Sequence, residues 1–345
     1  MADRLRDLLN HRRQRVAIAI SLVVGLAAVG GFLSLRHAIS SPAKLPPEDR
    51  TLVIPNGASL PTIARRLAEA GLVRSPWRFR LAARLSGAAT KLQAGEYRLS
   101  TGMSPRELTR LLVEGHTVEV SVTIPEGLTV REVAKAIEAA GLAEVTAVER
   151  LATDRSFVSS LGIEAPSLEG YLHPETYRFR KGAGARPVIA AMVAATMSIF
   201  DDEAVAVAST MGLTPHEVLT LASIVEKETG MAEERPRIAA VFLNRLGRSI
   251  LLQADPTVIY ALGDGFDGNL TRDHLNLDSP YNTYRYSGLP PTPIANPGRA
   301  SIEAVLRPAD VEDLYFVAKP NGSHHFSATL REHERAVRRY QRGRR

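Results

Sequence analysis

The stretch LTPHEVLTLASIVEKETG, residues 213–230, is the most informative part of this chain. It opens with Thr214 as an N-cap, Pro215 at the first helical position and Glu217 as a capping-box partner three residues after Thr214. An apolar run from Val218 to Val225 then covers nearly every helical face, and the charged residues 226–228 precede Gly230, a natural stop. Because a helix that is apolar on all sides is buried, the stretch predicts a buried helix ending just before Gly230.

Two carboxylates, Glu226 and Glu228, stand at the end of this predicted helix. Ionised carboxylates are seldom buried without a partner. Desolvation in a cleft wall would raise the pKa of one of them enough for it to act as a general acid. A solvated helix end, or an ion pair with Lys227 or Arg235, is the simpler interpretation. The spacing alone does not choose between the two glutamates.

Composition narrows the classes of function. With 345 residues the chain is long enough for two or three domains, and it has no cysteine, which excludes disulfides, a thiolate nucleophile and Cys-ligated zinc. The net charge of +6 is concentrated in the tails: residues 1–15 carry +3, residues 331–345 carry +5, and the body sums to −2. We therefore expect no nucleic-acid partner.

Residues 16–35 predict a membrane span. The run holds 20 residues without a charge, and at about 1.5 Å per residue it crosses about 30 Å of hydrocarbon. Five arginines precede it, so the positive-inside rule places the N-terminus in the cytoplasm and the rest outside. No small-x-small cleavage site follows, which favours a retained anchor over a cleaved signal peptide. Residues 36–50 then read as a Pro- and Ser-rich linker.

An internal repeat follows the linker. TLVIPNGASLPTIARRLAEAGLV (51–73) and SVTIPEGLTVREVAKAIEAAGLA (121–143) align at an offset of 70. Each reads as a strand, an Ile-Pro-x-Gly turn and an amphipathic helix that ends in Ala-Gly-Leu. Between the copies, residues 92–115 predict a short strand at Tyr97 and a helix after Ser104 that ends at Gly115. Such units predict a small α+β binding module.

The rest of the body alternates helices with polar loops. SLEGYLHPETYRF (167–179) holds Glu169, His173 and Glu175, which either face a cleft or, more simply, cap turns in a packed corner. Residues 279–298 are dense in Pro, Tyr, Asn and Thr, a composition suited to binding sugar rings or to a rigid surface loop. The further expected elements are one long helix over 187–211, helices over 235–246 and 251–262, a hairpin over 314–329 turning at Asn321-Gly322, and a basic helix at the C-terminus.

Carboxylate chemistry is what these residues allow. Ser223 lies in no Gly-x-Ser-x-Gly elbow, and the nine histidines show no metal-ligand spacing, so we expect neither a metal nor a cofactor. A glycoside hydrolase needs two carboxylates. A lytic enzyme needs one, because the 6-hydroxyl of the sugar attacks its own anomeric carbon with a large effective molarity.

The residues resemble the endolytic murein transglycosylases, the MltG or YceG-like family. The likeness covers about residues 50–335 and includes a segment similar to that family's LysM-like module, AGEYRL…MSPRELTRLLVEG (94–115). The motifs that carry it are LASIVEKET (221–229), LQADPTVIY (252–260), YNTYRYSGLPPTPIANPG (281–298), LYFVA…HHFS (314–327) and EGYLHPETYRF (169–179).

The resemblance implies an α+β lyase of the inner membrane. It would cleave nascent peptidoglycan strands to give 1,6-anhydro-N-acetylmuramic acid ends, with peptidoglycan synthases as partners. It implies Glu226 as the catalytic acid, and motif position suggests substrate-binding roles for Gln253, Asp255, Tyr281, Asn282, Tyr284 and Glu175. The alternatives are a non-catalytic peptidoglycan-binding adapter and a hydrolase that pairs Glu226 with Glu175 or Asp255.

The expected domain organisation follows from these segments. It comprises a cytoplasmic tail (1–15), a transmembrane helix (16–35), a linker (36–50), a LysM-like module (51–120), a YceG-like catalytic domain (121–335, with a connecting subdomain 121–184 and a core 185–335) and a basic tail (336–345).

Overall fold

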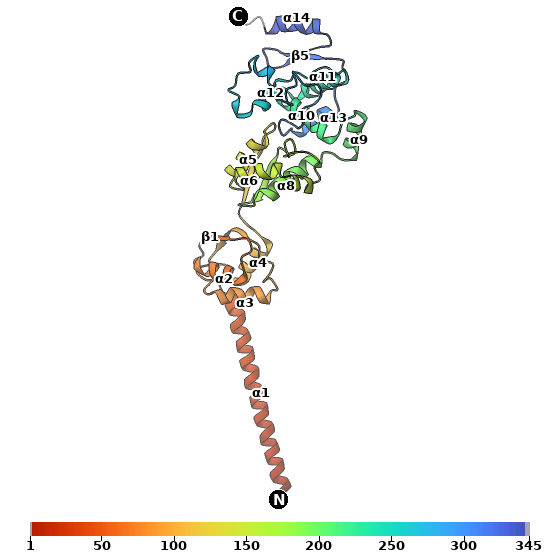
Figure 1. Cartoon of the computed structure of the whole chain (residues 1–345). Helices are drawn as coiled ribbons and strands as arrows, with labels where there is room; N and C mark the ends of the chain where they lie inside the picture. Colours follow the sequence, from red (N-terminus) through yellow and green to blue (C-terminus); the bar gives the residue numbers. More distant parts are fainter. Residues whose placement is uncertain (1, 342–345) are drawn as a thin grey trace. The chain divides into compact units, whose positions relative to one another are not determined.

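The computed structural model describes the backbone of residues 2–341 and the side chains of residues 17–341. It divides into two compact units, Met1–Glu119 and Val120–Arg345. Both mix helices with short two-stranded sheets, as expected for an α+β chain (Figure 1). The side chains of the predicted cytoplasmic tail, 1–15, and the last four residues of the basic tail lie outside the described part.

The first unit begins with a long helix, α1 (Ala2–Ser40). Its segment Ala17–Ser40 is apolar and long enough to cross a membrane, and the side chains of residues 17–37 are exposed. The helix continues past the predicted end at residue 35, so the linker is shorter than expected, from Ser41 to Glu48. Pro42 explains the stop, because a proline disfavours helical backbone at the residue before it.

The rest of the first unit surrounds a small apolar core. Strand β1 (Asp49–Ile54) pairs antiparallel with β2 (Gly95–Ser100), with Ile54 opposite Gly95. Tyr97, Phe79 and Leu67 are buried at its centre. The covering helices are α2 (Leu60–Glu69), α3 (Pro76–Leu85) and α4 (Pro105–Glu114), of which α3 had not been predicted.

The second unit starts with the second copy of the repeat. Strand β3 (Glu119–Thr123) pairs with β4 (Thr176–Arg180), and α5 (Val130–Ala139), α6 (Val145–Thr153) and α7 (Arg155–Ser160) follow the chain. The prediction of one helix over 187–211 is wrong. Two helices form instead, α8 (Ala185–Met197) and α9 (Asp202–Thr210), because the Asp201 side chain caps a new helix by accepting from the Ala204 N–H.

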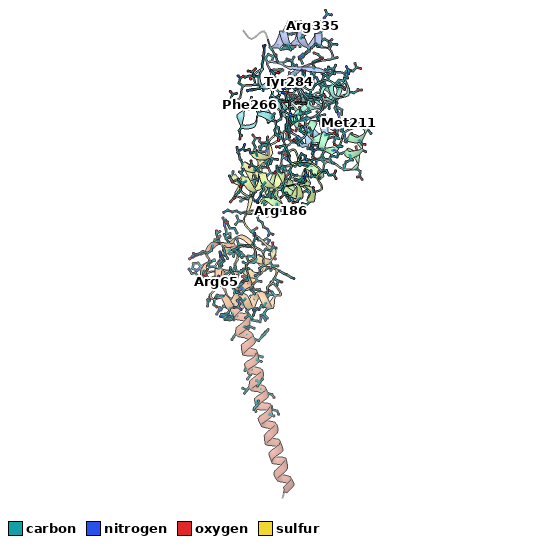
Figure 2. The ribbon with its side chains drawn as sticks, in the orientation of Figure 1. Arg65, Arg186, Met211, Phe266, Tyr284 and Arg335 are labelled. Carbon is teal, nitrogen blue, oxygen red and sulfur yellow. The ribbon has the colours of Figure 1, made fainter. Side chains whose placement is uncertain are left out.

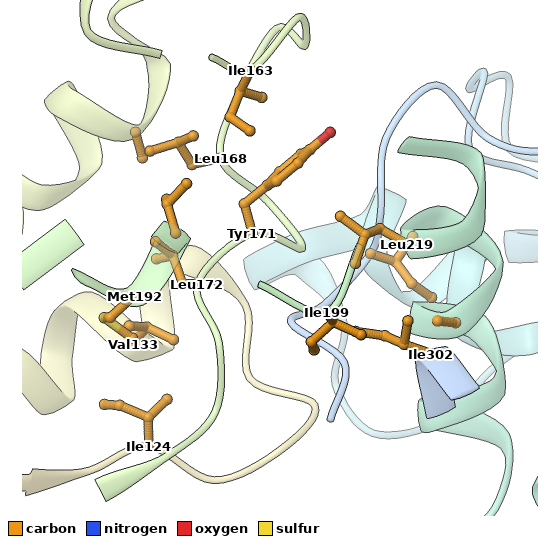
Figure 3. Close-up of a cluster of buried hydrophobic side chains, with 14 of the residues drawn as sticks. Ile124, Val133, Ile163, Leu168, Tyr171, Leu172, Met192, Ile199, Leu219 and Ile302 are labelled. Atoms are coloured by element: carbon orange, nitrogen blue, oxygen red, sulfur yellow. The ribbon is translucent and has the colours of Figure 1, made fainter. Parts of the chain in front are cut away.

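The remaining elements pack around α10 (Pro215–Glu228), whose side chains from Val218 to Val225 are all buried. The apolar cluster in Figure 3 joins α10 at Leu219 to α13 at Ile302, and α5 at Val133 to α8 at Met192. The helices and strands around α10 are α11 (Arg235–Gly247), α12 (Asp255–Leu262), α13 (Arg299–Leu306), β5 (Tyr315–Ala318), β6 (His324–Ser327) and α14 (Leu330–Tyr340), with short 3-10 turns at Ala232–Glu234, Gly263–Gly265 and His274–Asn276.

Candidate active site

The helix predicted from residues 213–230 forms as expected. The Thr214 hydroxyl accepts from the Glu217 N–H, and the Glu217 carboxylate accepts from the Thr214 N–H at 2.8 Å, which confirms the capping box. The helix ends at Glu228, with Thr229 as an extended C-cap. At 3.6 residues per turn, Glu226 and Glu228 point about 200° apart. The two glutamates therefore face different neighbours.

Glu226 is held by donors on three sides. Its Oε2 accepts from the Gly298 N–H at 3.0 Å and from the Ser301 hydroxyl at 2.8 Å, both at the start of α13. Its Oε1 accepts from the Arg235 guanidinium at 3.3 Å, and the Glu226 side chain is only 7% exposed. Arg235 also lies 3.5 Å from the Glu126 carboxylate. Through these contacts the Glu226 carboxyl group ties α10 to α11 and α13.

Glu228 has the opposite surroundings. Across the described side chains, residues 17–341, no hydrogen-bond donor or cation pairs with its carboxyl group. Burial and, to a lesser extent, the nearby charge of Asp255 raise the pKa of Glu228 to about 8, although the Arg245 guanidinium partly offsets both. Glu228 nevertheless retains solvent-accessible surface. A carboxyl group that is enclosed, protonated and still reachable is suited to giving a proton to a ligand.

The segment before α12 brings further polar groups to Glu228. Asp255 accepts a hydrogen bond from the hydroxyl of Tyr284, which is labelled in Figure 2. Burial raises the pKa of that hydroxyl most, and the neighbouring carboxyl groups of Asp255 and Glu228 add to the effect. Gln253 has a φ of 50°, a backbone conformation that residues other than glycine and asparagine adopt rarely. Its side chain is exposed, and its N–H donates to the Thr283 carbonyl at 3.1 Å. The structure thus brings Asp255 and Tyr284 close to Glu228, and Gln253 lies two residues before Asp255 in the chain.

Arg245 holds the segment before α12 in place, and its role was not predicted from the sequence. It is 8% exposed, and its guanidinium donates to the carbonyls of Leu251 and Leu252 at 3.1 and 2.8 Å and to that of Leu314 at 2.6 Å. The sequence did contain a signal, because Arg245 falls seven residues after the buried Ile238, on the apolar stripe of α11. A cation on a core stripe needs a specific set of acceptors.

Two residues of the 281–298 loop that were predicted to bind substrate, Tyr281 and Asn282, form hydrogen bonds within the protein. Asn282 is fully buried, and its amide donates to the carbonyls of Leu275 and Leu277 at 3.0 and 2.8 Å. Because Asn282 is buried and bonded in this way, we favour a role in fixing the loop rather than the predicted contact with substrate. Tyr281 is half-buried, with its hydroxyl 2.7 Å from that of Thr292 and its ring 5.0 Å from that of Tyr260.

A second buried carboxyl group, Glu169, lies under the same loop. It accepts from the Val130 N–H at 3.0 Å, the Tyr260 hydroxyl at 3.2 Å and the Asn296 amide at 3.4 Å. Burial raises the pKa of Glu169 to about 7, against the effect of these donors. Because it caps the start of α5, Glu169 confirms the interpretation of 167–179 as a packed corner.

Glu175, the remaining predicted residue, is exposed just before β4. Its carbonyl accepts from the Ile124 N–H at 3.0 Å, and its charge acts on His173. No hydrogen bond or ion pair among the described residues joins the Glu175 side chain to Glu226, Glu228 or Asp255. The described residues also contain no group of three or more His, Asp or Glu arranged to hold a metal ion.

Comparison with known proteins identifies the family of this chain. The model of the YceG-like family matches residues 52–339, which is most of the chain. The chain belongs to the YceG-like family. A structural relative agrees: the crystal structure of a YceG-like protein from Listeria monocytogenes superposes with a TM-score of 0.57 and 35% identity, covering 84% of this chain and 99% of that one.

Two further relatives of this YceG-like chain are named endolytic murein transglycosylase. The protein from Bacillus subtilis (strain 168) is 36% identical over 303 residues, covering 83% of each chain. The protein from Streptococcus pneumoniae (strain ATCC BAA-255 / R6) is 32% identical over 360 residues, covering 93% of this chain and 64% of its own length. The YceG-like chain thus spans slightly less than two thirds of the streptococcal relative.

Proposed function

We propose that this chain is an endolytic murein transglycosylase in which Glu228, rather than the predicted Glu226, donates and then accepts the proton. The relatives from Bacillus subtilis and Streptococcus pneumoniae carry this activity in their names. The observation that supports Glu228 is the contrast between the two carboxyl groups. Glu226 already accepts three hydrogen bonds, one of them from a guanidinium, whereas the carboxyl group of Glu228 has no partner among the described residues.

The first step requires a proton donor at neutral pH. With a pKa of about 8, Glu228 is mostly protonated there. It gives its proton to the oxygen that joins the anomeric carbon of N-acetylmuramic acid to the next N-acetylglucosamine. The bond from that carbon to the oxygen breaks, and the leaving strand keeps the electron pair and the proton. Positive charge develops at the anomeric carbon beside the newly ionised Glu228 carboxylate.

The second step closes the ring. The 6-hydroxyl oxygen of the same N-acetylmuramic acid attacks the anomeric carbon, and the Glu228 carboxylate takes the hydroxyl proton. The product is a 1,6-anhydro end, no water is consumed, and Glu228 is again protonated. One carboxyl group therefore completes the cycle, and Asp255 acts by raising the pKa of Glu228 rather than as a nucleophile.

The surrounding polar groups position the glycan. Gln253 is exposed and held at a positive φ, a strained conformation of the kind that clusters at ligand sites. The hydrogen bond between Asp255 and Tyr284 fixes the Tyr284 ring next to Glu228, where an aromatic face and a carboxylate can meet a sugar ring. We assign substrate contacts to Gln253, Asp255 and Tyr284, and a supporting role to Tyr281 and Asn282.

We also propose that the chain is anchored in a membrane. We assign α1 as a single-pass anchor with its N-terminus in the cytoplasm and the second unit outside, from its apolar segment and the preceding arginines. We assign the first unit as the LysM-like module that binds glycan, and peptidoglycan synthases as partners. These assignments place the enzyme where nascent strands emerge.

The test of the catalytic assignment is a pair of matched variants. Glu228→Gln keeps the shape of the side chain but removes the proton, and we expect cleavage of uncrosslinked glycan strands to fall roughly 10²–10⁴-fold. Glu226→Gln removes one partner of a buried ion pair, and we expect it to cost about 3 kcal/mol of stability but to leave turnover of the folded enzyme within about tenfold. Loss of turnover in Glu226→Gln, with Glu228→Gln active, would return the role to Glu226.

Product mass separates the alternatives. The lytic route gives anhydro ends, whereas a two-carboxylate hydrolase adds one water to each cut, so mass spectrometry of the products distinguishes them. A non-catalytic adapter would bind strands and release no fragment in wild type or in either variant.

The pH profile gives an independent check. Because Glu228 must be protonated to start the reaction, kcat/KM should be level below its pKa of about 8 and fall about tenfold per pH unit above it. Asp255→Asn removes the neighbouring negative charge that raises this pKa, so the fall should begin at lower pH. An unchanged profile in Asp255→Asn would contradict the coupling.

A further inference from the structure

Helix α3 buries one face in the first unit and leaves the other face uncovered. Phe79, Ala82 and Ala83 pack into the core, whereas Trp77 and Leu85 are 51% and 61% exposed. Trp77 and Leu85 are eight residues apart and lie on the side of the helix away from the core. Exposed aromatic and aliphatic side chains that share one helix face are a feature of interaction sites when they form one patch.

Cations surround this apolar stripe. No acidic residue occurs between Glu69 and Glu96, and the interval holds five cations: Arg74, Arg78, Arg80, Arg84 and Lys91. The Arg78 guanidinium lies 5.7 Å from the Trp77 ring centroid. None of the five forms an ion pair within the described side chains, although exposed arginines elsewhere in the unit, such as Arg65 and Arg110, lie beside a glutamate. The positive charge of this face is thus uncompensated.

The face lies beside the end of the membrane span. Residues 17–37 of α1 are exposed, but Ala38 is buried, and α1 contacts both α3 and α4 (Figure 1). From the end of the apolar run at Leu35 to Ala38 the helix rises only about 4.5 Å. The headgroup layer extends roughly 5–7 Å beyond the hydrocarbon on each side. The first unit therefore meets α1 at the depth of the lipid headgroups.

We propose that the exposed face of α3 docks on anionic phospholipid headgroups of the membrane that α1 spans. This rests on the anchorage assigned to α1 above. Guanidinium groups pair with lipid phosphates, and a tryptophan settles at the interface, where its ring is apolar and its N–H meets water. A basic segment next to a span gains affinity from each cation that reaches the anionic surface. The face therefore binds lipid rather than a soluble protein.

Trp77 is the single tryptophan of the chain, so the unmodified protein reports on this contact. The full chain is placed in nanodiscs, which leave both membrane faces open, made from neutral phosphatidylcholine or with added phosphatidylglycerol. We expect the acrylamide quenching constant of Trp77 to be at least about twofold lower in anionic discs. We also expect brominated lipids to quench Trp77. A Trp77 that is equally open to acrylamide in both discs, and unaffected by brominated lipid, would overturn the docking.

Charge variants test the role of the cations. With Arg74, Arg78, Arg80 and Arg84 all changed to Gln, quenching by acrylamide in anionic discs should rise to the value in neutral discs. The matched control changes exposed arginines away from α3, Arg65→Gln, Arg98→Gln and Arg110→Gln, and should keep the wild-type value (Arg65 is labelled in Figure 2). If both variants behave alike, the docking is not electrostatic and the proposal fails.

Anchorage is checked in the same samples. Extraction at alkaline pH leaves a spanning chain in the bilayer, and a chain that is released would overturn the assignment of α1 and this proposal with it. An embedded chain with an accessible Trp77 would overturn only the docking of α3. Neither result alters the test of glycan cleavage, which depends on Glu228.

Discussion

The two copies of the strand–turn–helix unit have similar backbones but different neighbours. Gly57 and Gly127, at equivalent places in the two turns, have φ values of 72° and 75°. A Cβ atom added at Gly57 would meet nothing within 4 Å, whereas one at Gly127 would lie 3.6 Å from the side chains of Glu226 and Lys227. One turn faces solvent and the other packs against the end of α10.

The second copy is bound to the candidate site by its backbone. The Gly127 N–H donates to the Asn296 carbonyl at 2.9 Å, and the Asn296 N–H donates to the Leu128 carbonyl at 2.8 Å. The Val130 N–H, at the start of α5, donates to Glu169. The same local sequence therefore makes a self-contained layer in the first unit and a support for the 291–298 loop in the second. Local sequence determines the strand–turn–helix structure of each copy, and the neighbouring residues determine what that copy supports.

The substitution Asn296→Ala should give the largest difference in stability between the two units. In Asn296→Ala the Leu172 N–H loses its acceptor, which lies at 2.8 Å, and a fully buried amide is replaced by a cavity. We expect a loss of about 3 kcal/mol of stability in the second unit and a loss of cleavage activity. Hydrogen exchange read by mass spectrometry reports on each unit separately, and the first unit should keep its protection.

Asn56→Ala is the control for this change in the first copy. Asn56 lies in the turn of the first copy, at the place that Glu126 holds in the second copy, and is exposed, so we expect a change within about 0.5 kcal/mol. Equal losses in the two variants would mean that the turns are equally supported, which would contradict the contacts of Asn296.

The pH dependence of stability should also differ between the copies. The pKa of Glu169 is raised from 4.5 to about 7, so the folded chain binds its proton more tightly than the unfolded chain. This contribution is fully present below pH 4.5 and is lost as the pH rises through about 7, at a cost of about 3 kcal/mol. Glu169→Gln should remove this part of the fall and leave the part that the raised pKa of Glu228 contributes up to about pH 8.

The measurement is urea unfolding of the second unit at several pH values. The exposed Glu175→Gln, six residues further along the same segment, is the matched control and should keep the wild-type fall. If Glu169→Gln retains the full pH dependence, Glu169 is not the buried titrating group beneath the second copy.

Much of the fold was predictable because its signals are local. Four features depend on only a few adjacent residues: the capping box at Thr214, the helix over 235–246, the turn at Asn321-Gly322 and the end of α4 at Gly115. The break between α8 and α9 was missed because both sides are Ala-rich. The cap at Asp201, which decides the break, is only one residue. Helix α3 was missed because its arginines obscure its apolar stripe.

The candidate site was predictable in its segments but not in its roles. The LASIVEKET, LQADPTVIY and 281–298 motifs do meet, around the end of α10. The different surroundings of Glu226 and Glu228 depend on Arg235, Gly298 and Ser301, contacts that no local pattern encodes. The partners of Asn282 and Arg245 could not be predicted for the same reason, since they are backbone carbonyls distributed along the chain.

The smallest expected difference concerns the helix caps of the two copies. Ser59 and Thr129 are the N-caps of α2 and α5, and each side chain accepts from the N–H three residues later. Ser59→Ala and Thr129→Ala should each cost about 1 kcal/mol, seen as a shift in the urea midpoint of the unit concerned. In α5, however, the next N–H belongs to Val130 and reaches Glu169 at 3.0 Å. Thr129→Ala should therefore also reduce glycan cleavage, while Ser59→Ala should leave the turnover of soluble strands unchanged. Equal activities would show that the second copy supports the site through its turn and not through its helix.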